Sequence, residues 1–305
     1  VAEYNPLHRG HQYQLQQARL QADCVIVVMS GAFVQRGEPA AYDKWMRCRW
    51  ALEAGADLVL ELPAVYALQS ARGFALGAVR TLSEAGCNML SFGTESDDIG
   101  ALTEAAALIN KEGSDFQAAL KVELKRGKSY PRARHDALEA VGEARPEVIA
   151  CLKHPNFLLA AEYIRAMDGL REPMALLPVI RRGEGHDASL QEGSVDGPEK
   201  GLSLREAHYA SASRIRAMAK IQQDNPRMAH YLPPRVWQEL RHFPPAQMEN
   251  LENILLYKLR SSSIEELAGL FGADEGLEQL LMRAAAASGL EEVLACCKSK
   301  RYTLA

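Results

Sequence analysis

Short apolar runs alternate with helical patterns through residues 1–92 of this 305-residue chain. The longest run, Cys24-Val25-Ile26-Val27-Val28-Met29, is rich in β-branched residues and is typical of a strand buried on both faces of a parallel sheet. Residues 1–4, 57–62 and 89–92 are expected to supply three more strands. The alternation predicts right-handed βαβ crossovers and an α/β fold with a Rossmann-like parallel sheet.

The loops that follow these strands are where a ligand is expected, because ligands of parallel sheets bind beyond the carboxyl ends of the strands. Residues 5–10, 30–39 and 93–96 each follow a predicted strand. We therefore expect these three loops to share one edge of the sheet.

The rest of the chain is mainly helical in pattern. Residues 98–144 have helical periodicity, residues 175–180 form the next expected strand, and a helix is expected from Ser211. Prolines punctuate residues 222–246, and short amphipathic helices follow them. These features predict an α/β domain over residues 1–222 and a helical C-terminal domain over residues 223–305.

Composition narrows the functional classes. The net charge of -4 gives no overall attraction to nucleic acid, so an RNA-binding surface must be a local basic patch. The six cysteines form no CxxC pair, which favours reduced thiols over a metal site or disulfides. No apolar run is long enough to cross a bilayer and no leader is recognisable, so a cytoplasmic protein without membrane contact is expected. The chain begins at Val1, and we expect apolar residues ahead of it to complete the first strand.

The sharpest motif is Asn5-Pro6-Leu7-His8-Arg9-Gly10-His11, which follows a strand and opens a helix. This spacing allows both imidazoles to face one anion, beside the unpaired N–H groups of the helix N-terminus. Gly10 leaves room for a flat base to approach the backbone. His8 and His11 are therefore candidate catalytic residues that stabilise charge on the α-phosphate of ATP while pyrophosphate leaves.

A second motif, Ser211-Ala212-Ser213-Arg214-Ile215-Arg216, begins a helix late in the α/β region. Hydroxyl groups, free backbone donors and guanidinium groups suit a polyphosphate. Ser211, Ser213 and Arg216 are therefore candidates for binding the β- and γ-phosphates of ATP.

Further motifs are spread along the whole chain: Ser30-Gly31-Ala32-Phe33-Val34-Gln35-Arg36-Gly37-Glu38-Pro39, Asp43-Lys44-Trp45, Glu61-Leu62-Pro63, Ser91-Phe92-Gly93-Thr94-Glu95, Ser129-Tyr130-Pro131-Arg132-Ala133-Arg134 and Lys298-Ser299-Lys300-Arg301-Tyr302-Thr303-Leu304. With these motifs the chain resembles the bacterial tRNA(Met) cytidine acetate ligase family. The resemblance implies an HxGH nucleotidyltransferase-like catalytic domain and a helical region that helps to hold tRNA. It also implies that acetate and ATP form acetyl-adenylate, whose acetyl group passes to the wobble cytidine of elongator tRNA(Met) to give N4-acetylcytidine.

The resemblance also implies a nucleotide site, with Gly93, Asn156, Arg181 and Arg182 as contacts. Family members commonly carry a second asparagine where Phe157 stands here, and the choice between Arg181 and Arg182 stays open. The first residues of the chain complete the implied ATP site: Val1, Ala2, Glu3, Tyr4, Asn5, Pro6, Leu7, His8, Arg9, Gly10, His11, Gln12, Tyr13 and Gln14.

Other polar residues are candidates of a weaker kind. Gln35, Arg36 and Lys44 form a candidate acetate or phosphate loop. Asp43 and Arg47 are expected to form an i, i+4 ion pair. Basic residues beside Tyr130 and Tyr302 suit RNA phosphates and bases, which makes them candidate tRNA contacts: Arg126, Lys128, Arg132, Arg134, Lys298, Lys300 and Arg301.

Mg²⁺ is expected from the pyrophosphate chemistry, although no carboxylate pair identifies its ligands and no metal-binding residue is predicted. No obligate protein partner is expected. Two alternatives remain open: an adenylyltransferase for a small metabolite such as pantetheine phosphate, and an RNA-binding protein that uses the fold without catalysis. The helical extension disfavours the first, and the presence of both histidines with the serine and arginine motif disfavours the second.

Overall fold

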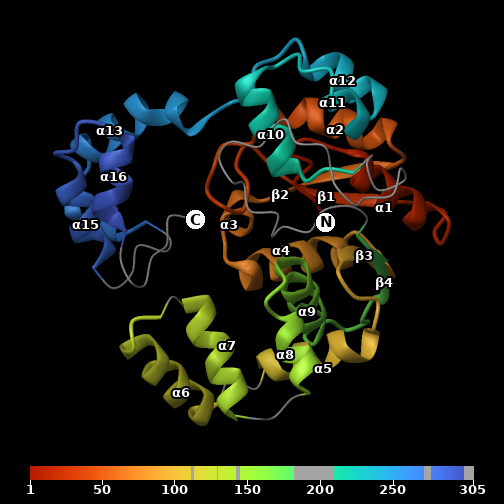
Figure 1. Cartoon of the computed structure of the whole chain (residues 1–305), viewed down its shortest axis with the longest axis horizontal. Helices are drawn as coiled ribbons and strands as arrows, with labels where there is room; N and C mark the ends of the chain where they lie inside the picture. Colours follow the sequence, from red (N-terminus) through yellow and green to blue (C-terminus); the bar gives the residue numbers. More distant parts are fainter. Residues whose placement is uncertain (111–112, 129, 142–144, 182–208, 271–275, 299–305) are drawn as a thin grey trace.

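The computed structural model describes residues 1–110, 113–128, 130–141, 145–181, 209–270 and 276–298 (Figure 1). Four strands form two parallel pairs: β1 (Ile26–Ser30) with β2 (Leu58–Leu62), and β3 (Met89–Thr94) with β4 (Ala175–Ile180). Ile26 lies opposite Leu58, and Met89 opposite Ala175. The strands expected from the apolar runs at residues 24–29, 57–62, 89–92 and 175–180, and their parallel direction, are thus confirmed, whereas residues 1–4 contribute only an isolated bridge at Ala2.

The N-terminal segment runs beside β1 and extends that pair. The backbone N–H of Ala2 donates to the carbonyl of Val28 at 2.9 Å, and the N–H of Ser30 donates to the carbonyl of Ala2 at 3.2 Å. A cavity of about 390 Å³ lies between this segment, β1 and β3, with Val1, Val27 and Leu90 on its wall.

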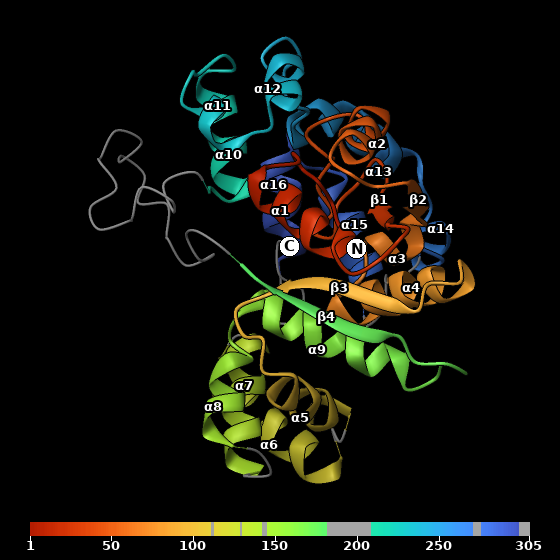
Figure 2. The ribbon, with the colours of Figure 1, turned by 90° about the vertical axis from the view of Figure 1, so that its right-hand side faces the viewer.

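Helices cover both faces of the strands, as expected for βαβ units (Figure 2). Val28 of β1 packs in one core with α4 (Ala71–Glu84) and α9 (Pro155–Met167), while Val27 and Met29 pack in another with α1 (Arg9–Arg19) and α2 (Lys44–Glu53). The continuous apolar run is therefore explained by burial on both faces. The short helix α3 (Ala64–Ala67) leads into α4.

A helical subdomain lies between β3 and β4 in the sequence. It contains α5 (Ile99–Asn110), α6 (Ser114–Lys125), α7 (Tyr130–Val141) and α8 (Pro146–Cys151). Side chains such as Phe116, Leu120 and Ile149 give it a small core of its own. The predicted helical character of residues 98–144 is confirmed where the chain is described.

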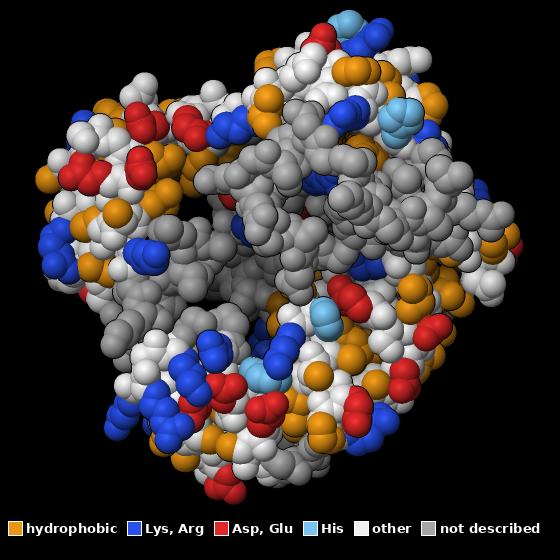
Figure 3. Space-filling view, in the orientation of Figure 1, with side chains coloured by type: hydrophobic (Ala, Val, Ile, Leu, Met, Phe, Trp, Pro, Cys, Tyr) orange, Lys and Arg blue, Asp and Glu red, His pale blue; other side chains and the backbone are white. Residues whose placement is uncertain are grey.

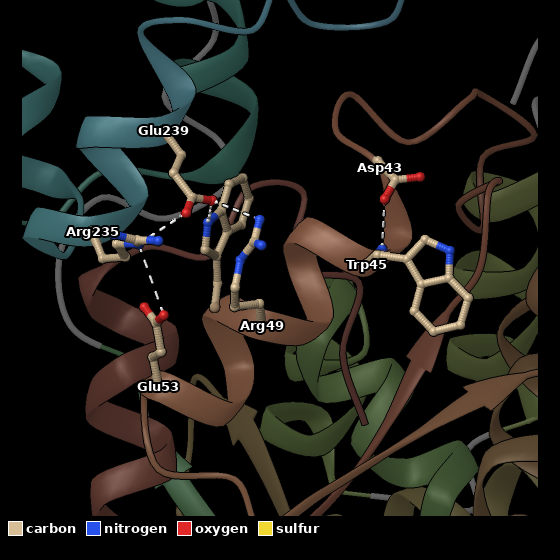
Figure 4. A network of polar contacts seen from close by, with 7 residues as sticks. Asp43, Trp45, Arg49, Glu53, Arg235 and Glu239 are labelled. Atoms are coloured by element: carbon tan, nitrogen blue, oxygen red, sulfur yellow. Dashed lines mark hydrogen bonds and ion pairs between the residues drawn. The ribbon is translucent and has the colours of Figure 1, made fainter.

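Three further helices, α10 (Ala212–Ile221), α11 (Met228–Tyr231) and α12 (Pro234–Leu240), pack against β1, α1 and α2 in one hydrophobic core. Met228, Leu232 and Leu240 are fully buried in the same core as α1 and α2. Glu239 of α12 accepts hydrogen bonds from Trp50 Nε1 at 2.9 Å and from Arg49 at 3.2 Å (Figure 4). Residues 228–240, which follow the expected boundary at residue 222, thus pack in the core that α1 and α2 share.

The last helices form a separate cluster, joined to α12 by one extended segment (Figure 1). They are η1 (Met248–Leu251), α13 (Glu252–Ser261), α14 (Ile264–Ala268), α15 (Leu277–Ala284) and α16 (Leu290–Cys297). Leu256, Ala284, Ala287 and Val293 make their small core. All six cysteines are unpaired, and no helix in the described part of the chain combines the length and apolarity that crossing a membrane requires.

Candidate functional site

The turn that carries the first motif is held from behind by distant segments. Asn5 is buried, and its Oδ1 accepts a hydrogen bond from the backbone N–H of Ala41 at 2.7 Å. Its carbonyl accepts a bond from Arg216 at 2.8 Å. The Asn5–Pro6 peptide is cis, and Tyr4 has a φ of 46°, an uncommon conformation for a non-glycine residue. Such a conformation persists where surrounding contacts fix it, as the packing of Tyr4 does here.

The two histidines of the motif form a reciprocal cap at the start of α1. His8 Nδ1 accepts a hydrogen bond from the N–H of Gly10 at 3.1 Å, and His11 Nδ1 accepts one from the N–H of His8 at 3.3 Å. A neutral imidazole that accepts at Nδ1 carries its proton on Nε2. Both rings therefore keep an Nε2–H donor for a ligand.

Burial keeps both imidazoles neutral. Desolvation, assisted by the charge of Arg181, lowers the pKa of His8 to about 3. The pKa of His11 is also well below its usual value, because of desolvation first and then the neighbouring His8 and Arg181. The positive charge at this site therefore comes from Arg181 and not from an imidazolium.

A cavity of about 50 Å³ opens at the carboxyl ends of the strands, in front of the histidines. Many of the predicted ATP contacts meet there, together with Tyr209, Ala210 and two β4 residues that were not predicted. Its wall consists of His8, Gly10, His11, Tyr13, Gln14, Gly93, Val179, Ile180, Arg181, Tyr209, Ala210 and Ser211.

The two glycines of this wall have different roles. A Cβ on Gly10 would lie 2.9 Å from Cε1 of His8, so glycine makes room for the imidazole ring itself. A Cβ on Gly93 would lie 3.6 Å from Cγ of Arg181, which is ordinary contact. The bare backbone of Gly93 thus leaves space for a ligand without being required by the packing of the protein.

The remaining predicted contacts near the N-terminus do not line the cavity. Leu7 and Tyr4 are buried in the core, and the guanidinium of Arg9 donates to the carbonyl of His230 at 2.7 Å. Glu3 Oε1 accepts a bond from the N–H of Gln35 at 2.9 Å. These residues support the turn instead of lining the cavity.

Asn156 and Arg181 are joined in one polar chain with Glu95. Arg181 donates to Asn156 Oδ1 at 3.0 Å, and Asn156 Nδ2 donates to Glu95 Oε1 at 2.6 Å. Desolvation lowers the pKa of Arg181, and Glu95 opposes that shift. Arg182 lies outside the described residues.

The serine and arginine motif is only partly at the cavity. Ser211 lines it, although its hydroxyl already caps α10 by accepting from the N–H of Arg214 at 3.2 Å. Arg216 bonds Asn5 and, at 3.4 Å, the hydroxyl of Ser213. In the described structure Arg216, which also contacts Ser213, braces the histidine turn, and neither residue lines the cavity.

The loop after β1 lies at the same edge, but its candidate residues are outside the cavity wall. Lys44 Nζ is 2.6 Å from Glu61 Oε2, so its charge is already paired. Gln35 is tied to Glu3 through its backbone, and Arg36 does not line the cavity either.

The expected ion pair between Asp43 and Arg47 is wrong. Asp43 Oδ1 instead caps α2 by accepting from the N–H of Trp45 at 2.8 Å (Figure 4). Arg47 is fully buried and donates to backbone carbonyls of Glu3, Ser30, Tyr42 and Gly31. Burial lowers its pKa to about 10. The i, i+4 spacing does not indicate that the guanidinium binds these backbone carbonyls instead of the Asp43 carboxylate.

The basic cluster near α6 and α7 is partly neutralised. Lys and Arg side chains gather there among acidic ones (Figure 3). Lys128 lies 2.5 Å from Glu123 and 2.6 Å from Asp136, and Arg126 also pairs with Glu123. Arg132 and Lys298 are exposed, whereas Lys300 and Arg301 lie outside the described residues.

Comparison with known proteins agrees with this geometry. The whole chain, residues 1–305, matches the HIGH Nucleotidyl Transferase family. It is 37% identical to the tRNA(Met) cytidine acetate ligase of Bacillus subtilis, over 99% of this chain and 72% of that protein, and 36% identical to that of Syntrophomonas wolfei, over 100% and 72%. A crystal structure of Thermotoga maritima TmcAL bound with alpha-thio ATP superposes with a TM-score of 0.81 at 32% identity, covering 100% of this chain and 70% of that one. The chain therefore belongs to the HIGH nucleotidyl transferase family and, within it, to the tRNA(Met) cytidine acetate ligases.

Proposed function

We propose that this chain activates acetate with ATP and transfers the acetyl group to the wobble cytidine of elongator tRNA(Met). An acetate oxygen attacks the α-phosphorus, and the bond to the bridging oxygen breaks to release pyrophosphate. The exocyclic amine of cytidine then attacks the acetyl carbon, AMP leaves, and the amine loses a proton to give N4-acetylcytidine.

The observation that carries this proposal is the pair of neutral Nε2–H donors at the start of α1. His8, His11 and Arg181 all line the cavity. Preorganised donors of this kind stabilise negative charge that grows in a transition state, and each is typically worth a factor of about 10² to 10³ in rate. We assign the two histidines to the α-phosphate and Arg181 to neighbouring phosphate charge.

We assign no protein ligands to Mg²⁺ among the described residues. None of the described residues on the cavity wall carries a carboxylate. The group of side chains in the described structure that could hold a metal ion is His135, Asp136 and Glu139 on α7, where Asp136 already pairs with Lys128. We therefore assign no catalytic step to residues that would bind Mg²⁺.

The RNA is expected to reach the cavity from the side of the exposed basic residues. We propose a catalytic unit that extends through α12 and a C-terminal helical unit that helps to hold tRNA, with Arg132 and Lys298 as phosphate contacts. Cytoplasmic tRNA(Met), ATP and acetate are then the partners that the reaction needs.

The test is ATP-dependent transfer of labelled acetate to purified elongator tRNA(Met). Label on the wobble cytidine with the natural chain, and a loss of at least about 10²-fold with His8→Ala or His11→Ala, is the expected result. His242→Ala is the matched control, because His242 is an exposed histidine outside the cavity wall.

Other outcomes identify the alternatives. Pyrophosphate release without labelled tRNA would keep the nucleotidyl transfer and reject this acceptor. RNA binding without pyrophosphate release, from a folded protein, would reject catalysis.

A further inference from the structure

Glu95 is the far end of a chain of side chains that leads into the cavity. It follows β3 directly and is exposed to solvent, and it does not line the cavity. Its Oε1 accepts a hydrogen bond from Asn156 Nδ2 at 2.6 Å. Asn156 Oδ1 in turn accepts one from the Arg181 guanidinium at 3.0 Å, and Arg181 lines the cavity.

The chemistry of the three groups fixes the direction of this chain. An ionised carboxylate only accepts hydrogen bonds, whereas an amide presents a donor on one side and an acceptor on the other. With Glu95 on one side, the amide of Asn156 must turn its NH₂ toward the carboxylate. Its oxygen is then left facing the guanidinium, which only donates.

The backbone of Arg181 is fixed by the end of the sheet, whereas its guanidinium depends on side-chain contacts for its position. Its backbone N–H donates to the carbonyl of Thr94 at 3.1 Å, which fixes the main chain at the end of β4. Its guanidinium stands at the end of a long flexible side chain whose ordering costs entropy. The negative charge of Glu95 also favours the charged form of Arg181 against desolvation.

We propose that Glu95 is a positioning residue, which acts through Asn156 to aim the Arg181 guanidinium at the phosphates of ATP. This inference rests on the proposed use of ATP. It assigns to Glu95 no contact with ATP, acetate or RNA, and it predicts that an acceptor at position 156 held toward Arg181, with one negative charge in the group, matters more than the identity of the residues.

The test is a double-mutant cycle in the full chain. Glu95→Gln removes the charge and lets the amide of Asn156 turn either way, while Asn156→Asp alone places two carboxylates against each other. Each single variant is expected to lower kcat/KM for ATP by about tenfold, mostly through KM, in ATP–pyrophosphate exchange with acetate.

The double variant carries the decisive prediction. With Glu95→Gln and Asn156→Asp together, the new carboxylate at position 156 accepts from both neighbours and the net charge equals that of the natural chain. Activity is expected to return to within about threefold, because the two changes are coupled instead of additive. Glu104→Gln is the matched control: Glu104 pairs with Arg145 at 2.7 Å on the outside of α5.

Several results would overturn the inference. Glu95→Gln could match the natural chain, or the double variant could be as weak as the product of the two single losses. Thermal unfolding of each variant distinguishes a loss of stability from a loss of the position of the Arg181 guanidinium. If the natural chain showed no exchange at all, the proposed function would fail, and calorimetric binding of ATP to the same four proteins would still decide the role of Glu95.

Discussion

The imidazole rings of His8 and His11 lie stacked, with centroids 3.7 Å apart and planes within 20° of parallel. Two protonated rings at this distance would repel each other, and both Nδ1 atoms already accept backbone N–H bonds. We therefore predict that both histidines are neutral Nε2–H tautomers at pH 7. Nitrogen-15 NMR of histidine-labelled protein checks this, and an Nδ1–H signal or a titration near pH 6.5 for either ring would contradict it.

The free energy of unfolding should decrease as the pH is lowered in the acid range, because the folded chain keeps His8 neutral. The pKa of His8 is about 3 in the folded chain and near 6.5 when it is unfolded. Between these values the unfolded chain binds a proton that the folded chain does not, so the free energy of unfolding decreases as the pH falls from about 6.5 toward 3. Urea unfolding at several pH values should show this decrease, and His8→Gln should make it shallower.

Replacement of Arg47 should destabilise the fold strongly. Arg47→Met leaves buried carbonyls of Glu3, Ser30 and Tyr42 without their donor. Each orphaned group costs roughly 1–3 kcal/mol, so a loss of about 3 kcal/mol or more is expected in urea unfolding. Arg49→Met on the same helix removes an exposed pair with Glu239 and should cost about 1 kcal/mol or less. Equal losses would show that the carbonyl contacts of Arg47 contribute little.

The length of the catalytic unit can be tested by truncation. A chain that ends at residue 246 retains Met228, Leu232 and Leu240, each of them fully buried. It should unfold cooperatively and keep ATP–pyrophosphate exchange. A chain that ends at residue 222 exposes the core these side chains cover, at about 1.5–3 kcal/mol for each, and should not fold. Circular dichroism melting distinguishes the two, and a stable shorter chain would restore the boundary expected from the prolines.

Removal of exposed basic residues should weaken tRNA binding in a salt-dependent way. Arg132→Ala and Lys298→Ala are each expected to reduce the slope of log affinity against log salt by about one. Arg19→Ala is the control, because Arg19 pairs with Asp57 at the opposite, amino-terminal end of β2. Filter binding with labelled tRNA(Met) at several salt concentrations measures the slopes, and unchanged slopes in both variants would exclude these contacts.

Local signals were enough to find the strands, the histidine turn and the capped start of α10. The β-branched run of β1 is buried along nearly its whole length, and Ser211 occupies an N-cap as its residue type suggests. The bonds of Arg47 and Arg216 to Glu3 and Asn5 join segments far apart in the sequence, so no spacing indicates them.

The prolines of residues 222–246 illustrate a different limit. Pro234 begins α12 and Pro233 precedes it, so these residues start a packed helix instead of marking a linker. Tyr209 reaches the cavity wall although it lies outside the motif that begins at Ser211. In both cases the tertiary neighbours, which the sequence pattern does not contain, decide the role.

The backbone of Ala41 makes hydrogen bonds to two segments that lie far from each other in the sequence. Its N–H binds the side chain of Asn5, and its carbonyl accepts from the N–H of Ala246 in the segment that leads to the C-terminal helices. The segment that leads to the C-terminal helices and the residue that precedes the cis proline of the histidine turn are therefore both bonded to the backbone of one alanine.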